Sequence, residues 1–264
     1  MQPLLKILYL GDIVGRPARD FIASSMGAIK RAQDIDVVIA NGENATSGAG
    51  IIREHAEQLR KAGIDVITLG DHVWDRNGFE NDIGGLDYVC RPANLPRECP
   101  GSNFVICKKD GVRIGVCVVL GRTFMKINAF CPFAAAEQIL RDSGPSVDVF
   151  LLEIHAEATS EKNAFGWNFD GKVAAVVGTH THVQTADERI LPKGTAYISD
   201  LGMCGSHESV IGREILPTIH RMKFSMPGKS EVATGDVRLN GALLTIDVNS
   251  GLARKITRFS EKMS

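Results

Sequence analysis

The sequence predicts an α/β protein in which two β-sheets pack face to face with helices on their outer sides. The first observation is a β-α-β-α-β pattern over residues 1–72, which is typical of a parallel sheet covered by helices. The second is a β-rich second half, where apolar runs alternate with turn signals such as Asn240-Gly241. The third is that no repeat, low-complexity tract or Pro/Ser-rich linker divides the chain, so we expect a single domain over residues 1–264.

Hydrophobic periodicity assigns the elements of the first half in chain order. Short apolar runs predict strands, whereas Phe21, Ile22, Met26 and Ile29 recur near helical spacing. Gly63 is a stop signal for the second helix. We expect strands over residues 4–10, 36–40 and 65–69, and helices over residues 16–33 and 53–62.

The middle and the end of the chain carry further strands. Lys109-Asp110-Gly111 separates two apolar runs, which indicates a hairpin. The run at residues 172–177 is rich in valine and alanine and is typical of a buried strand. We expect the hairpin over residues 103–108 and 112–120, a helix over 133–141, and strands over 147–152, 172–177, 195–199, 232–239, 242–248 and 253–259.

Composition and charge limit the partners. Hydrophobic residues make up 44% of the chain and charged residues 23%, which are ordinary values for a globular protein. The formal net charge of −1 gives no electrostatic footprint for an anionic membrane or a nucleic-acid backbone, although RNA remains possible as a substrate. No apolar run approaches the ~18 residues of a membrane-spanning helix, and no signal-peptide cleavage site is evident. We expect a soluble, cytoplasmic protein that binds no membrane. Both a monomer and a homo-oligomer agree with the sequence.

The six cysteines are scattered along the chain. None forms the CxxC pair that a zinc ribbon needs, so we expect free thiols in a reducing compartment. Only Cys204, which follows Gly202-Met203, is considered as a neighbour of a functional site.

Side chains that can bind metal ions follow five of the expected strands. Open α/β sheets place their sites at the carboxyl ends of strands, so we expect these side chains to converge. His180 and His182 are two residues apart, and on an extended chain they would present two imidazoles to one point. His55, His207 and His220 lack this context and are interpreted as structural or surface residues. The strand-end candidates are Asp12, Glu43, Asn44, Asp71, His72, His155, His180 and His182.

The chemistry of this set indicates transition metals. Carboxylates, a carboxamide and imidazoles without a thiolate favour Mn, Fe or Zn over a structural cysteine-type zinc site. The set is too large for one four-coordinate ion, so two ions that share a bridging carboxylate are the economical assignment. Two ions ~3.5–4 Å apart suit the in-line displacement of a phosphoryl group.

Four motifs in the chain match those of a known family. They are Gly11-Asp12-Ile13-Val14-Gly15, Asn41-Gly42-Glu43-Asn44, and the segments 155–162 and 178–187. On these motifs the chain resembles the YmdB-like metallophosphoesterases, a branch of the calcineurin-like phosphoesterase superfamily, from Asp12 to about Gly212 and more weakly to the C-terminus. The resemblance implies a four-layer α/β/β/α sandwich of two mixed sheets flanked by helices. It also implies a dinuclear centre, often of iron or manganese, and phosphodiesterase activity that includes 2′,3′-cyclic nucleotides.

The resemblance further implies two ligand sets that share Glu43 as the bridge. By residue match, one set is Glu43 with Asp12, Asn44 and His182, and the other is Glu43 with Asp71, His155 and His180. A metal-bridged hydroxide would attack phosphorus, and His72 would be the general acid that protonates the leaving oxygen. The chemistry of His72 agrees with this role, because it neighbours a ligand, cannot easily reach the same ion and titrates near neutrality.

One residue departs from the family pattern, which usually has Asn-His where this chain has Asp71-His72. The carboxylate can still coordinate, but it changes the charge of the site. Arg91, Asn94 and Arg122 lie in loops after expected strands and could meet a phosphate, because guanidinium matches its geometry. Solvated loop residues are the alternative interpretation.

The leading hypothesis for the function is a metal-dependent phosphodiesterase. A metal- and nucleotide-binding regulatory module with little turnover is the alternative, which the unusual Asp71 keeps open. An amidohydrolase also uses an HxH motif and two metals. Its barrel needs about eight βα units, and the β-rich second half does not supply them.

Overall fold

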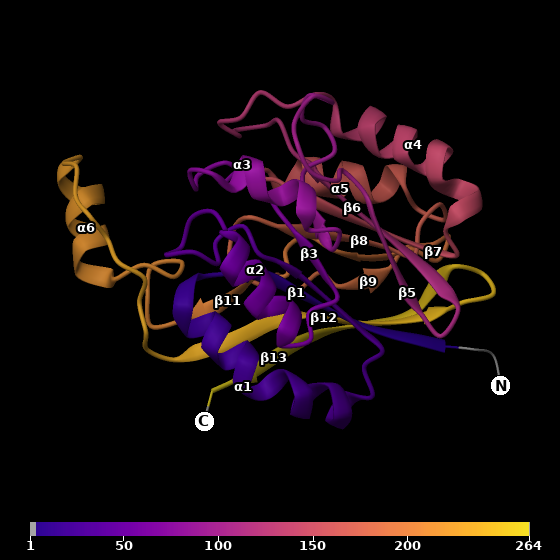
Figure 1. Cartoon of the computed structure of the whole chain (residues 1–264), viewed down its shortest axis with the longest axis horizontal. Coiled ribbons are helices and arrows are strands. Elements are labelled where there is room, and N and C mark those ends of the chain that lie inside the picture. Colours follow the sequence, from indigo (N-terminus) through magenta and orange to yellow (C-terminus); the bar gives the residue numbers. More distant parts are fainter. Residues whose placement is uncertain (1–3, 264) are drawn as a thin grey trace.

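The computed structural model describes residues 4–263 and consists of two mixed β-sheets with helices on their outer sides (Figure 1). The first sheet has the strand order β13-β12-β11-β1-β2-β3-β4, and the second has the order β5-β6-β7-β8-β10-β9. The strands of the first sheet are β1 (Leu4–Ile13), β2 (Val37–Asn41), β3 (Val66–Thr68), β4 (Val89–Cys90), β11 (Met203–Ser206), β12 (Val237–Asp247) and β13 (Leu252–Lys262). The strands of the second are β5 (Val105–Lys109), β6 (Val112–Leu120), β7 (Val149–His155), β8 (Ala175–Thr179), β9 (Arg189–Ile190) and β10 (Ala196–Ile198).

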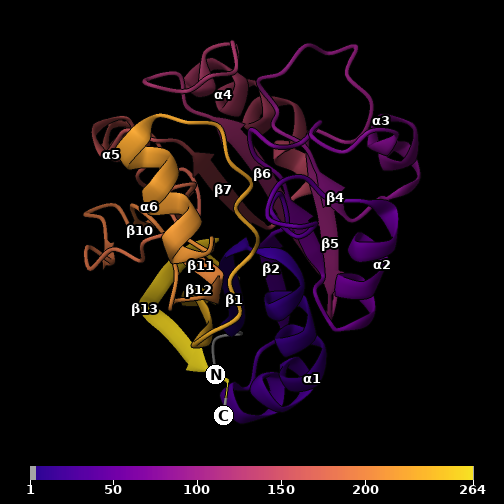
Figure 2. The same cartoon turned by 90° about the vertical axis from the view of Figure 1, so that its left-hand side faces the viewer.

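The helices of the described residues are α1 (Gly15–Gln33), α2 (Arg53–Lys61), α3 (Phe79–Asp82), α4 (Pro132–Ser143), α5 (Thr159–Asn168) and α6 (Ile215–Phe224), with short 3-10 turns η1 (Ile83–Gly85) and η2 (Gly144–Ser146). Figure 2 shows α1 and α2 on one side of the sheets and α4 and α5 on the other.

The period of two along each strand sorts its side chains into layers. In β1, Leu8 and Leu10 belong to the core that α1 covers, whereas Tyr9 lies between the two sheets. In β7, Leu151 lies between the sheets and Leu152 belongs to the core under α4 and α5. The expected four-layer α/β/β/α sandwich is therefore confirmed. The expectation of a single domain over residues 1–264 stays a prediction.

The expected turn at Asn240-Gly241 is wrong. These residues lie inside β12, which runs unbroken from Val237 to Asp247 and pairs with β1 on one side and β13 on the other. A Cβ atom at position 241 would lie 2.2 Å from the carbonyl oxygen of Tyr9. Glycine is therefore needed at this position by the close approach of β1 and not by a turn.

Strand ends and two helices also differ from expectation. β1 and β7 extend to Ile13 and His155, which places Asp12 and His155 inside strands and not after them. The sequence did not indicate α5, which has no clear apolar stripe, or α6. The short strands β4, β9 and β11 were also not expected.

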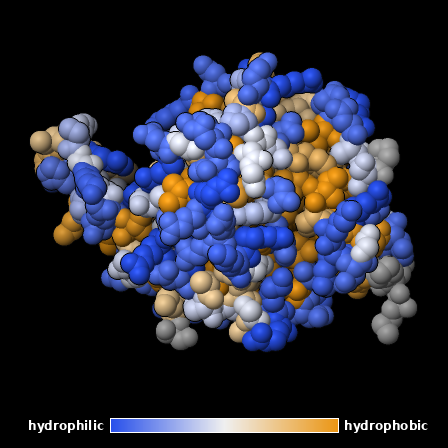
Figure 3. Space-filling view, viewed as in Figure 1, coloured by the Kyte–Doolittle hydropathy of each residue, from blue (hydrophilic) through white to orange (hydrophobic). Residues whose placement is uncertain are grey.

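Helix α6 stands away from the sheets. Figure 3 shows it projecting on the left of the molecule with apolar residues at its surface. Leu216, Met222 and Phe224 are all more than half exposed, so the apolar side of this helix has no partner within residues 4–263. Among these same residues, no helix combines the length and the hydropathy that a membrane-spanning segment requires.

Candidate metal centre

The candidate ligands gather at one edge of the two sheets because their strands run parallel. β1, β2 and β3 are parallel neighbours in the first sheet, and β7 and β8 are parallel neighbours in the second. Their carboxyl ends therefore meet at the same edge. The loops after β2, β3 and β8 carry Glu43, Asp71 and His180, and β7 itself ends at His155.

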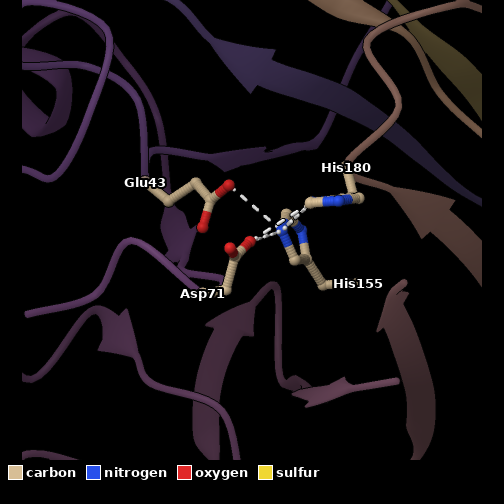
Figure 4. A group of neighbouring side chains, drawn as sticks. All are labelled: Glu43, Asp71, His155 and His180. Atoms are coloured by element: carbon tan, nitrogen blue, oxygen red, sulfur yellow. Dashed lines mark hydrogen bonds and ion pairs between the residues drawn. The ribbon is translucent and has the colours of Figure 1, made fainter. Parts of the chain in front are cut away.

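Four of these side chains form a tight cluster, which Figure 4 shows. One ligand atom from each of Glu43, Asp71, His155 and His180 lies within 4.8 Å of the others. The Nε2 atom of His155 lies 2.9 Å from Asp71 Oδ1 and 3.1 Å from Glu43 Oε1. It also lies 3.1 Å from His180 Nδ1. Two carboxylates and two imidazoles thus point at one small volume.

The spacing of these atoms fits a shared metal ion. Two ligands that each lie about 2.1 Å from an ion, at about 90° to one another, are about 3.0 Å apart. The observed separations of 2.9 and 3.1 Å around His155 Nε2 match this value. The donor set of carboxylate oxygens and imidazole nitrogens suits Mn, Fe or Zn.

The imidazoles are also oriented as metal ligands are. In each ring one nitrogen contacts an acceptor, and the other faces the site. His155 Nδ1 lies 2.8 Å from Thr179 Oγ1, and His180 Nε2 lies 3.2 Å from a carboxylate oxygen of Glu157. His182 Nδ1 lies 3.0 Å from the backbone oxygen of Ile211. These contacts leave the opposite nitrogens available to a metal ion.

A second group of candidates lies beside the cluster. His182 Nε2 is 3.8 Å from Asp12 Oδ1 and 3.3 Å from the amide nitrogen of Asn44. The Asn44 amide also donates to Glu43 Oε1 at 3.2 Å, which connects the two groups. Glu43 is therefore the residue that both groups share.

Asp12 gives independent support for a cation at this position. Its Oδ1 atom is buried and accepts no hydrogen bond from the described residues. Burial, reinforced by the nearby charges of Glu43 and Asp200, raises the pKa of Asp12 to about 8. An unpaired buried carboxylate is costly, whereas a bound cation would satisfy it.

The expected geometry of the HxH motif is wrong in one respect. His180 and His182 have φ values of +99° and +65°, so the chain is not extended between them. As a result His180 joins the cluster with Asp71, whereas His182 turns toward Asp12. Positive φ is strained for residues other than glycine and persists where the surroundings enforce it.

A buried ion pair enforces this turn. Asp200 Oδ2 accepts hydrogen bonds from the backbone N–H and the hydroxyl of Thr181, at 3.0 and 2.7 Å. The same oxygen lies 2.7 Å from Lys162 Nζ, and both charged side chains are almost fully buried. Neither residue was among the candidates from sequence, although Lys162 belongs to the 155–162 motif and was available as a signal.

His72 lies beside the cluster and not in it. Its backbone N–H donates to Glu43 Oε2 at 3.0 Å, and its Nδ1 atom lies 2.6 Å from Asp75 Oδ2. Burial lowers the pKa of His72, but the charges of Glu43 and Asp75 outweigh it and raise the pKa above the ordinary value. These charges therefore favour the protonated form of the His72 imidazole at the edge of the site.

A cavity of about 540 Å³ opens over these residues. Glu43, His72, His180 and His182 line it, and Arg221 of α6 lines it from the other side. The cavity connects the cluster, the imidazole of His72 and solvent. It is the space in which a small substrate can reach both.

The three candidate phosphate contacts do not lie in this cavity. The guanidinium of Arg91 is buried and donates to the backbone oxygens of residues 92, 99 and 100. The amide of Asn94 donates to the backbone oxygens of Leu120 and Phe130. Arg122 is exposed and its backbone N–H contacts Glu161. Arg91 and Asn94 therefore organise loops, and the interpretation as phosphate ligands is wrong for them.

The cysteines contribute no ligand to the cluster. All six are free thiols, and Cys204 is fully buried with its Sγ atom 3.4 Å from the backbone oxygen of Asn240. Burial raises the pKa of the Cys204 thiol to about 12, so it is an unreactive core residue.

Comparisons with known proteins agree with this geometry. A Bacillus subtilis protein named 2′,3′-cyclic-nucleotide 2′-phosphodiesterase is 40% identical over 96% of both chains. A hypothetical protein from Thermus thermophilus has a crystal structure that matches with a TM-score of 0.92 and 35% identity, over 98% of this chain and 100% of that one. A structure described as a novel phosphatase from Mycoplasma pneumoniae matches with a TM-score of 0.91 and 33% identity, over 99% of this chain and 95% of that one. The family model described as YmdB-like protein matches residues 8–259, and the chain therefore belongs to the YmdB-like family.

Proposed function

We propose that this protein is a metal-dependent phosphodiesterase that hydrolyses small phosphodiesters, 2′,3′-cyclic nucleotides among them. The observation that carries the proposal is the cluster of Glu43, Asp71, His155 and His180 beside His72 at the base of an open cavity. The substrate class follows the name of the Bacillus subtilis relative, which is 40% identical over nearly the whole chain.

Two ions are the proposed cofactors, with iron or manganese preferred and zinc as the alternative. One would be held by Glu43, Asp71, His155 and His180. The other would be held by Glu43, Asp12, Asn44 and His182, with Glu43 between them. The spacing around His155 Nε2 supports the first set, and the unsatisfied Asp12 oxygen supports the second.

The residues of the chain supply positioning and proton transfer. When bound, the ions would supply positive charge that stabilises a phosphoryl transition state and lowers the pKa of a coordinated water. His72 is the proposed general acid, because Asp75 holds its Nδ1 atom and leaves Nε2 to donate a proton to the leaving oxygen. Asp75 would orient the imidazole and favour its charged form.

Hydrolysis of bis(p-nitrophenyl) phosphate and 2′,3′-cyclic AMP by Mn²⁺-loaded protein tests the proposal. We expect turnover that disappears in the His182→Ala variant and on chelation. Metal binding without turnover above that control would contradict the enzyme and support the alternative, a regulatory module that binds metal and nucleotide. Asp71 favours this alternative, because a third carboxylate reduces the positive charge available for catalysis.

We also propose a cellular location and an oligomeric state. A cytoplasmic location suits a cyclic-nucleotide substrate and free thiols. The exposed apolar side of α6 would suit a homo-oligomer, which sedimentation of the full chain would test.

A further inference from the structure

Glu153 is a buried carboxylate in the layer between the two sheets, where most of the packed side chains are apolar. Val149, Leu151 and Glu153 alternate along β7 on the face that packs against the first sheet, and His155 follows at the next position. Both Glu153 and His155 are fully buried. Burial of a carboxylate without polar partners is costly, so contacts with other residues must offset this cost.

Four side chains from four different strands donate to this carboxylate. Tyr9 donates to Oε2 at 2.7 Å, and Thr68 donates to the same oxygen. Asn41 and Thr179 each donate to Oε1 at 2.7 Å. No lysine or arginine among the described residues forms an ion pair with Glu153. These four donors satisfy both oxygens of the carboxylate, an arrangement that suits a group that only accepts hydrogen bonds.

One of these donors connects Glu153 to the cluster. Thr179 stands opposite His155 in the register of β7 and β8, and its Oγ1 atom lies 2.8 Å from His155 Nδ1. A hydroxyl has one proton, and the hydroxyl of Thr179 donates it in the hydrogen bond to Glu153 Oε1. The oxygen of Thr179 is then left to accept a hydrogen bond from the N–H at His155 Nδ1.

The direction of these hydrogen bonds determines which nitrogen of the His155 imidazole carries the proton. With its proton on Nδ1, a neutral His155 has its lone pair on Nε2, the atom that faces Glu43 and Asp71. The Asn41 amide nitrogen also approaches His155 Nδ1, but at 3.4 Å and as a second donor it cannot replace Thr179 as the acceptor. Its stronger contact is to Glu153.

We propose that Glu153, acting through Thr179, is a positioning residue that holds His155 in the form able to bind a metal ion. The buried charge of Glu153 would also strengthen the ligand, since a polarised outer partner makes an imidazole a better donor. This inference rests on the proposed function, in which His155 is a ligand. It adds Glu153 and Thr179, which lie behind the cluster, to the residues that shape it.

Matched threonine variants separate this role from a purely structural one. Thr179 and Thr68 are both fully buried and both donate to Glu153, but only Thr179 contacts His155. Thr179→Val and Thr68→Val each remove one hydroxyl that donates to Glu153, with little change in side-chain volume. The measurements are the Mn²⁺ dissociation constant by chelator competition and the melting temperature of the metal-free protein.

We expect similar losses of melting temperature in the two variants but different losses of Mn²⁺ affinity. Thr179→Val should bind Mn²⁺ about 10–100-fold more weakly, the usual effect of losing an outer partner of a ligand. Thr68→Val should stay close to the unchanged protein, and Thr179→Ser, which keeps the hydroxyl, should restore binding. Equal losses in both valine variants, or no loss in Thr179→Val, would overturn the inference.

Two further variants complete the test. If Thr179→Val does not fold, Glu153→Gln takes its place, because it keeps the shape and removes the charge, and it too should weaken Mn²⁺ binding. Unchanged binding in that variant would overturn the inference. His155→Ala tests the proposed function separately. If His155→Ala retains all of its Mn²⁺, the proposed metal site itself is wrong, whereas a loss there without a loss in Thr179→Val refutes the Glu153 role alone.

Discussion

Replacing Asp71 by Asn removes one negative charge from the cluster while keeping the shape of the side chain. Asp71 Oδ1 lies 2.9 Å from His155 Nε2 and 3.2 Å from His180 Nδ1. Burial raises the pKa of Asp71, but the hydrogen bonds to these two imidazoles outweigh it and hold the pKa well below its ordinary value. Because an amide oxygen still binds metal ions, we expect weaker binding and not its loss.

The size of the effect follows from Coulomb's law. Two unit charges 4 Å apart interact by about 1 kcal/mol in water and about 4 kcal/mol at an effective dielectric constant of 20. A divalent ion doubles these values, to about 2 and about 8 kcal/mol. In the metal-free protein Asp71 contacts the two imidazoles, and this interaction is lost when an ion binds. The net loss of binding free energy in Asp71→Asn should therefore lie near the lower value of about 2 kcal/mol, which is a roughly 30-fold loss of Mn²⁺ affinity.

Chelator competition with Mn²⁺ measures this loss. Asp75→Asn is the matched control, because it makes the same charge change at a residue that contacts His72 outside the cluster. The control should change Mn²⁺ affinity by less than about fivefold, since an exposed charge contributes about 1 kcal/mol or less. Unchanged affinity in Asp71→Asn, or an equal loss in both variants, would refute the reasoning.

Three further predictions concern other parts of the chain. His72→Ala should lower kcat about 10²–10⁴-fold for a cyclic nucleotide, and less for a p-nitrophenyl ester whose leaving group needs little protonation, with metal content unchanged by elemental analysis; loss of metal would contradict the acid role. Arg113 holds the pKa of Asp148 at about 2, below its ordinary 3.8, so Asp148 stabilises the fold above about pH 4 and loses this effect as the pH falls toward 2. Because this pair is partly exposed, Asp148→Asn should reduce the free energy of unfolding by less than about 1 kcal/mol at pH 7 in urea titrations, with the difference gone near pH 2; a constant difference would disprove the linkage. Gly241→Ala should destabilise by about 1–3 kcal/mol in the same titrations, because the new Cβ would meet the carbonyl oxygen of Tyr9; an unchanged midpoint would show that β12 can move away.

Local patterns predicted most of the fold and indicated the candidate residues of the site. The expected helix at residues 16–33 is α1 to within one residue, and the hairpin at Lys109-Asp110-Gly111 joins β5 and β6. The candidate ligands were proposed because they follow apolar runs, and the carboxyl ends of parallel strands meet at one edge. The arrangement of Glu43, Asp71 and His155 in the structure agrees with that reasoning.

Several features could not be predicted, because they depend on how the chain packs and not on local periodicity. Asn240-Gly241 resembles a turn, and only the approach of β1 makes it the middle of a strand. Helix α5 lacks an apolar stripe, so its periodicity gave no signal. Arg91 lies in a loop, as a phosphate ligand would, but in the folded loop its guanidinium donates to the backbone oxygens of residues 92, 99 and 100.

The sequence by itself determined which chemical groups are present and at which strand ends they lie, because both depend on residue type and on short-range periodicity. Only the tertiary structure decided how those groups are oriented. Asp200 and Lys162 turn His180 and His182 toward different parts of the site, although the two histidines are two residues apart. Glu153 reaches His155 through Thr179 only because β7 and β8 pair in one register and four strands of a two-sheet core close around a single carboxylate. Hydrogen bonds have short range and defined directions, so such contacts exist only after distant segments of the chain have packed together.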